Sequence, residues 1–92
     1  STPGGLRTTD HGMERLIERG LLDKADEIYR NPTYRIIQGT DGAEVFIKKR
    51  SSRRRVYDYI VVGDNGIVSA LDNLSKDQLN KLAVNFEWEN WF

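Results

Sequence analysis

Cysteine is absent from this 92-residue chain, and histidine occurs once, at His11. Without cysteine there are no disulfides, thiolate zinc sites or thiol nucleophiles, and one histidine cannot build a histidine-rich metal site. No apolar run approaches the roughly 20 residues that a membrane span needs. Two tryptophans, three phenylalanines and four tyrosines can still supply a core. We therefore expect one small domain that folds without disulfides, metal or cofactor.

The formal net charge is zero, but the charges are unevenly distributed. Residues 1–63 carry twelve Lys or Arg against nine Asp or Glu, and residues 64–92 carry two against five. Six of the cations fall within residues 48–55. Such a segment fits a surface that contacts a phosphate backbone. The alternative is a solvated loop whose charge keeps a hairpin edge from pairing with other chains.

Two helices are predicted in the first third of the chain. Residues 1–7 are Pro- and Gly-rich and indicate a linker or frayed end, so we expect the domain to span 8–92. Thr8, Thr9 and Asp10 are candidate N-caps, and Gly20 is placed to end the first helix. A second helix is expected over 21–30, because Asn-Pro follows it.

Alternating hydrophobicity then predicts four strands, over residues 33–38, 43–49, 54–62 and 67–71, joined by turns at 39–42, 51–52 and 63–66. Ser75 starts a final helix whose apolar face contains Leu79, Leu82, Ala83 and Phe86. The order predicts an α+β fold with two N-terminal helices packed on a four-stranded antiparallel sheet and a C-terminal helix. We expect the helices to share one face of the sheet.

The opposite face would then be open. Tyr57 and Tyr59 share one face of the third strand, and the other face is mostly aliphatic, with Val56, Asp58, Ile60 and Val62. If the aliphatic face is the core, Tyr57 and Tyr59 point to the open face, beside the basic turn. Aromatic rings among cations are suited to binding single-stranded RNA, because bases stack on the rings and the cations neutralise phosphates. The alternative is that the two tyrosines pack against side chains of neighbouring strands. The aromatic and acidic segment 86–92 is expected either to cover the sheet or to bind a partner.

His11 is the only side chain whose ordinary pKa lies near ~6.5. On a helix it shares one side with Arg15 and Arg19, while Met13, Leu16 and Ile17 form the packing stripe on the other side. This row suits proton transfer beside bound phosphate. The alternative is an ordinary solvated helix face.

The residues present exclude several mechanisms. Two-histidine ribonuclease chemistry, a glycine-rich phosphate loop and a serine hydrolase elbow are all missing. A metal-dependent nuclease would place a lysine two residues after a strand carboxylate, and Glu44 is followed by Phe46 there. Metal-free RNA cleavage remains possible, because the 2′-hydroxyl of the substrate supplies the nucleophile.

His11, Arg15, Arg19 and Gly20, followed by a second helix and an antiparallel meander, resemble the C-terminal toxin domains of bacterial polymorphic toxins. Contact-dependent growth inhibition effectors are among them, within the barnase/EndoU/colicin/RelE-like ribonuclease superfamily. The resemblance implies a metal-independent endoribonuclease, often acting on tRNA. It also implies delivery within a larger effector to the target-cell cytoplasm, consistent with a chain that does not begin with Met, and inhibition by an immunity protein, which we expect to have an acidic binding surface.

The resemblance also implies site residues. His11 is the general base or acid and Arg15 stabilises the phosphate, with further groups on the strands. The expected catalytic set is His11, Arg15, Lys48, Tyr59 and Ser69. The expected RNA-binding set is Arg19, Lys49, Arg50, Arg53, Arg54, Arg55 and Tyr57. A one-residue change of register would exchange Lys48 with Lys49.

Two other functions remain open. One is a noncatalytic RNA-binding module that uses Tyr57, Tyr59 and residues 48–55. The other is a protein-interaction domain, such as an immunity protein or antitoxin, that binds no RNA beyond salt-sensitive association.

Overall fold

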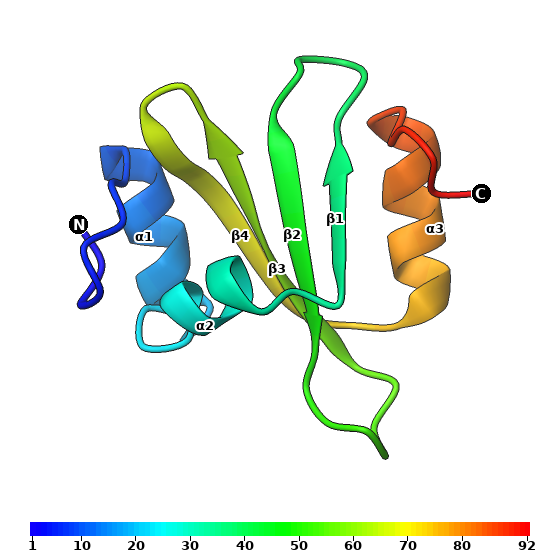
Figure 1. The fold of residues 1–92 in the computed structure, drawn as a ribbon, viewed down its shortest axis with the longest axis horizontal. Coiled ribbons are helices and arrows are strands. Elements are labelled where there is room, and N and C mark those ends of the chain that lie inside the picture. The colour runs from blue at the N-terminus through cyan, green and yellow to red at the C-terminus, as the bar shows by residue number, and fades with distance from the viewer.

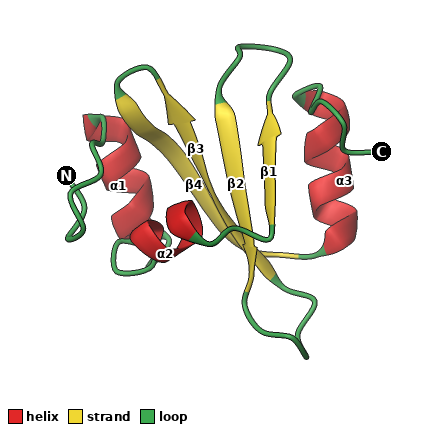
Figure 2. Cartoon of the chain, viewed as in Figure 1, coloured by secondary structure: helices red, strands yellow, loops and turns green.

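Three helices and four strands follow one another in the computed structural model, which describes residues 1–92 (Figure 1, Figure 2). The strands form one antiparallel sheet in chain order, β1-β2-β3-β4. The elements are α1 (Asp10–Glu18), α2 (Ala25–Arg30), β1 (Tyr34–Ile37), β2 (Glu44–Lys49), β3 (Tyr57–Gly63), β4 (Gly66–Leu74) and α3 (Lys76–Asn85). The predicted α+β class and the order of elements are confirmed.

The helix ends follow local signals in the sequence. Thr9 is the N-cap of α1, where its hydroxyl accepts a hydrogen bond from the Gly12 amide at 2.9 Å. Gly20 adopts a φ of +66°, the left-handed conformation expected just after a helix. Ser75 and Gln78 cap α3 reciprocally. The predicted second helix is too long, because the chain forms a turn before α2 begins at Ala25.

The third strand is shorter at its start than predicted, and the fourth is longer at its end. β3 begins at Tyr57 instead of residue 54, and β4 continues to Leu74. The basic residues between β2 and β3 therefore lie in a loop that extends beyond one end of the sheet (Figure 1). The two other hairpin turns lie at the opposite end of the sheet (Figure 1).

Helices cover both faces of the sheet, so the prediction that they share one face is wrong. One face packs against α1 and α2 through residues such as Leu16, Ile28 and Ile60. The other packs against α3 and the C-terminal segment through residues such as Val45, Leu79 and Trp88. The physical reason lies in β3, where five consecutive residues from its start are buried, as expected for a strand packed on both faces.

Both chain ends pack against the domain. Segment 1–7 is not frayed: Thr2 is buried, its hydroxyl donates to Asp26 Oδ1 at 2.7 Å, and the Gly4 amide donates to Oδ2 at 3.0 Å. At the other end, Trp88 is buried and its indole Nε1 donates to Gln38 Oε1 at 3.2 Å. The C-terminal segment therefore covers the sheet. Phe86, predicted on the apolar face of α3, is 40% exposed.

Candidate functional site

The row of His11, Arg15 and Arg19 borders the contact between α1 and β4. Gly12 and Leu16 are the buried residues of α1, whereas Ile17 is 61% exposed. The buried side of α1 is therefore centred on Gly12 and Leu16 instead of on the predicted stripe of Met13, Leu16 and Ile17. Since successive residues differ by about 100° around a helix, the buried side is rotated toward the row. As a result, the row lies along the margin of the sheet instead of opposite it.

Gly12 explains why α1 lies so close to the edge strand. A Cβ at this position would overlap the carbonyl oxygen of Ile67 at the start of β4. The Thr9 amide donates to the same oxygen at 3.0 Å. These contacts hold His11 near the turn between β3 and β4. Arg19, at the other end of α1, lies about 12 Å from His11 along the helix axis, because each residue adds about 1.5 Å.

The three side chains of the row differ in their surroundings. His11 is exposed. Arg15 forms an ion pair with Glu18, Nη1 to Oε2 at 2.9 Å, and its side chain is 35% exposed. Arg19 is exposed, and its positive charge acts on the hydroxyl of Tyr59. The row therefore combines an accessible imidazole with two guanidinium groups.

Tyr59 is buried instead of exposed on an open face. Its side chain is 4% exposed, and its ring lies edge-on to Trp88 with centroids 6.0 Å apart. Burial raises the pKa of Tyr59 to about 12, against a smaller lowering by Arg19. The phenol therefore keeps its proton at neutral pH and can donate a hydrogen bond but cannot act as a base.

The predicted catalytic set does not come together at one point. Ser69 is half-buried opposite Val61, on the α3 side of the sheet. Lys48 lies opposite Asp58 on the α2 side, where its Nζ donates to the Asn31 carbonyl at 2.6 Å. The start of α1, which carries His11, lies against Ile67, and Ile67 is paired with Val62 of β3. Along β3, Val62 is about 13 Å from Asp58, the partner of Lys48, at about 3.3 Å per residue. Lys48 is thus far from His11.

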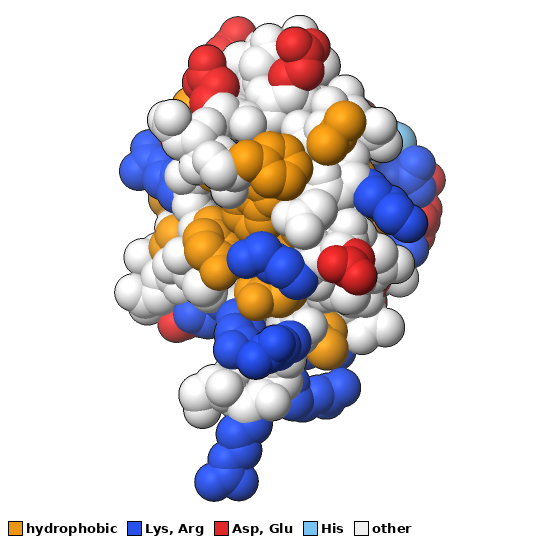
Figure 3. Space-filling view, turned by 90° about the vertical axis from the view of Figure 1, so that its right-hand side faces the viewer, with side chains coloured by type: hydrophobic (Ala, Val, Ile, Leu, Met, Phe, Trp, Pro, Cys, Tyr) orange, Lys and Arg blue, Asp and Glu red, His pale blue; other side chains and the backbone are white.

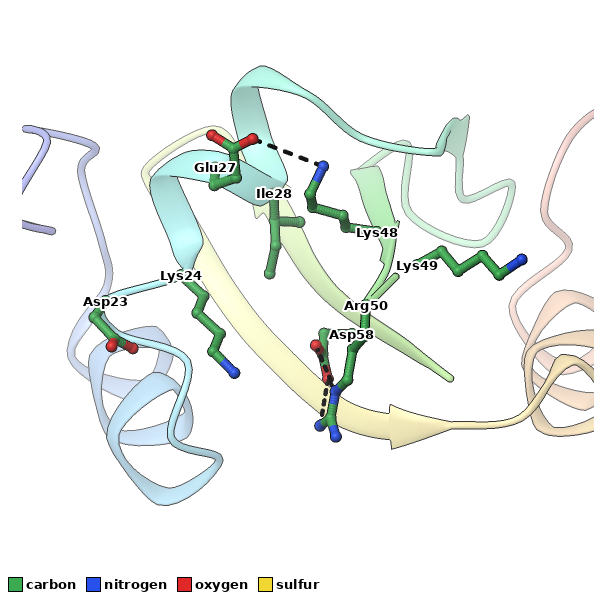
Figure 4. Close-up of a pocket in the computed structure, with 8 residues that line it drawn as sticks. All are labelled: Asp23, Lys24, Glu27, Ile28, Lys48, Lys49, Arg50 and Asp58. Carbon is green, nitrogen blue, oxygen red and sulfur yellow. Dashed lines mark hydrogen bonds and ion pairs between the residues drawn. The ribbon is translucent and has the colours of Figure 1, made fainter. Parts of the chain in front are cut away.

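A groove of 260 Å³ lies between α2 and the end of β2 (Figure 4). Its lining is mostly charged: Asp23, Lys24, Glu27, Ile28, Lys48, Lys49, Arg50 and Asp58. Lys48 points toward Glu27, with Nζ 3.8 Å from Oε1. Most of these charges therefore pair within the fold.

Arg50 anchors the basic loop instead of extending from it. Its Nη2 and Nε donate to the Asp58 carboxylate at 2.9 and 3.1 Å (Figure 4). Asp58 is 4% exposed and also accepts from the Asn73 amide at 3.0 Å. The hydrogen bond with Asp58 raises the pKa of Arg50. Two of the three nitrogens of this guanidinium are therefore bound within the fold, and the expectation that Arg50 contacts RNA stays a prediction.

The remaining predicted RNA contacts divide into exposed and buried residues. Arg53, Arg54 and Arg55 are exposed on the projecting loop, so they can reach phosphates. Lys49 is half-buried on the α3 side, opposite Tyr57. Tyr57 itself is 5% exposed, so it cannot stack on a base. The prediction that Tyr57 lies on an open face is therefore wrong, because α3 and the C-terminal segment cover this face, as they do at Tyr59.

The structure shows one aromatic group that sequence analysis missed. Tyr34 of β1 and Trp91 of the C-terminal segment pack edge-on, with centroids 5.1 Å apart. The Nζ atom of Lys76 lies 4.8 Å from the ring centroid of Tyr34 and 4.9 Å from that of Trp91. The aromatic character of the C-terminal segment was the only signal in the sequence, because these residues are far apart along the chain.

Together these features define a small α+β domain with cationic side chains on α1 and at one end of its sheet. No protein-family model, curated protein or solved structure matches the chain. None of its helices has the length and apolar character needed to cross a membrane.

Proposed function

We propose that this chain is a metal-independent endoribonuclease, the toxin domain of a bacterial polymorphic toxin that acts on RNA, with tRNA as the expected target. The supporting observation is the row on α1, where exposed His11 is followed by Arg15 and Arg19 along the margin of the sheet. These groups match what RNA transesterification needs: a proton acceptor and positive charge for the phosphoryl oxygens.

In the proposed reaction, the 2′-oxygen attacks the adjacent phosphorus while His11 takes its proton. The bond from phosphorus to the 5′-oxygen breaks, leaving a 2′,3′-cyclic phosphate and a 5′-hydroxyl. With no second imidazole in the chain, protonated His11 is also the group best able to return a proton to the leaving oxygen. Arg15, one turn along the helix from His11, stabilises charge on the phosphoryl oxygens, and Arg19, a further turn away, binds the RNA backbone. Lys48 and Ser69 are left out, because neither lies beside His11.

The basic loop supports the same proposal as a second contact for the RNA backbone. Arg53, Arg54 and Arg55 project from the end of the sheet toward which α1 runs (Figure 1). A cognate immunity protein would present an acidic surface to these cations. Delivery as part of a larger effector belongs to this proposal as well.

The test is incubation of the protein with total tRNA in EDTA, followed by analysis of the new ends. We expect cyclic phosphate and 5′-hydroxyl ends, and a loss of about 10²- to 10⁴-fold in cleavage rate for His11→Ala. Glu14→Ala is the matched control, because Glu14 is also exposed on α1. Intact RNA with the folded parent protein, or equal rates for the parent and His11→Ala, would contradict the proposal.

A noncatalytic RNA-binding module is the second candidate. The observation that favours it is the exposed arginine loop, which lies apart from His11 and needs no chemistry to bind phosphates. In that case His11→Ala would bind RNA as the parent does, and neither protein would cleave it.

A further inference from the structure

A partly exposed aromatic and cationic surface lies at the end of the sheet that carries the basic loop, where Tyr34 and Trp91 are half-buried and Lys76 is exposed. Tyr34 begins β1, Lys76 begins α3 and Lys49 ends β2, and all three ends lie near the loop (Figure 1). The view onto the α3 side shows hydrophobic side chains at the centre and Lys and Arg side chains over and below them (Figure 3). Rings and positive charges therefore share one continuous surface.

We propose that Tyr34, Trp91 and Lys76 bind an unpaired nucleotide of single-stranded RNA. The base contacts the two rings, and Lys76 and Lys49 hold the flanking phosphates. The inference deepens the proposed function and rests on RNA as its substrate, since it assigns the place where unpaired bases of that substrate bind.

The charges of this surface favour RNA over other partners. None of the ion pairs of the chain includes Lys49 or Lys76. Lys76 donates a hydrogen bond to the Tyr34 hydroxyl at 3.2 Å, which holds its ammonium group at the two rings. A cation beside an aromatic ring suits the alternation of phosphates and bases along a single strand.

The rings are also held in place before any ligand binds. The Trp91 indole donates from Nε1 to Asn80 Oδ1 at 2.8 Å, and its ring lies edge-on to buried Trp88 at 5.3 Å. Tyr34 packs against Tyr57, with centroids 6.2 Å apart. Binding therefore costs little additional ordering of these side chains.

The test compares two fluorescent single-stranded RNA probes in which 2′-O-methyl groups prevent cleavage. One carries bases and the other is abasic over the same backbone. We expect the parent to bind the first about tenfold more tightly, and Tyr34→Leu and Lys76→Gln to lose at least threefold in affinity for it. Tyr34→Leu should bind the abasic probe as the parent does. Tyr29→Leu is the matched control, because Tyr29 is 39% exposed on α2.

The outcomes separate this inference from the cleavage proposal. Base-dependent binding that Tyr34→Leu abolishes supports the inference, whether or not the parent cleaves tRNA. Equal affinity for the two probes, an unchanged ratio in folded Tyr34→Leu, or unchanged affinity in folded Lys76→Gln would overturn it. A change of oligomeric state in Tyr34→Leu, measured by sedimentation with RNA affinity unchanged, would also overturn it by assigning the surface to a second copy.

Discussion

The hydroxyl of Tyr59 shows how one residue changes its chemistry when a face of the sheet becomes covered. Alternation along the third strand correctly placed Tyr57 and Tyr59 on the same side. It could not show that α3 and Trp88 would cover that side, because this depends on contacts between distant segments. The residue expected to belong to the catalytic set or to stack on bases is a buried, protonated phenol instead.

Burial of Tyr59 predicts a loss of stability at alkaline pH. Its pKa is about 12 in the folded protein and ~10 in the unfolded chain, so folding favours the protonated form. The free energy of unfolding should therefore be unaffected by this group below about pH 10. It should then fall by about 1.4 kcal/mol per pH unit up to about pH 12. Urea unfolding across this range should show a shallower decline for Tyr59→Phe, and parallel curves would contradict the assignment.

Helix α1 depends on one small residue for its position. The caps at Thr9 and Gly20 could be read directly from local sequence, because each acts on its own backbone. The face that α1 buries could not, since Gly12 contributes no hydrophobicity and is buried only because the backbone of Ile67 lies against it. That contact rotates the helix and brings the His11 row to the margin of the sheet.

Gly12→Ala should therefore displace α1. We expect a loss of about 1–3 kcal/mol in stability, because the new methyl group would overlap the Ile67 carbonyl, although alanine favours helix. Thermal unfolding should show a midpoint lower by several degrees. Glu14→Ala on the same helix is the control and should stay within about 0.5 kcal/mol of the parent. An unchanged midpoint for Gly12→Ala would show that α1 does not depend on this close approach.

At the scale of the whole molecule, the basic segment of the sequence becomes a cationic end. In the view onto the α3 side, basic side chains gather at the loop end of the sheet, and acidic side chains lie at the opposite end and also near the middle (Figure 3). Arg50 is bonded to the buried carboxylate of Asp58 and fixes the base of the loop, so the cations have a defined position. The sequence predicted a basic segment but not that Arg50 would turn back into the fold.

Replacing Arg53, Arg54 and Arg55 with Gln should weaken the salt dependence of RNA binding. Each lost phosphate contact lowers the slope of log affinity against log salt by about 0.7 for a single strand, so three contacts predict a decrease of about 2. Titration of a single-stranded probe between low and moderate salt measures this slope. Lys24→Gln, an exposed cation on the α2 side, should keep the parent slope. An unchanged slope in the triple variant would place the RNA elsewhere.

The sequence alone determined the order of elements, the turns at 39–42 and 63–66 and the caps of α1 and α3, because these follow from periodicity and from residues that act on their own backbone. Tertiary structure decided which residues are accessible. It covered Tyr57 and Tyr59, turned Arg50 inward, docked segment 1–7, and brought Tyr34, Lys76 and Trp91 together. The physical reason is that burial depends on what packs on each face of a strand, and the partners come from segments far away in the chain.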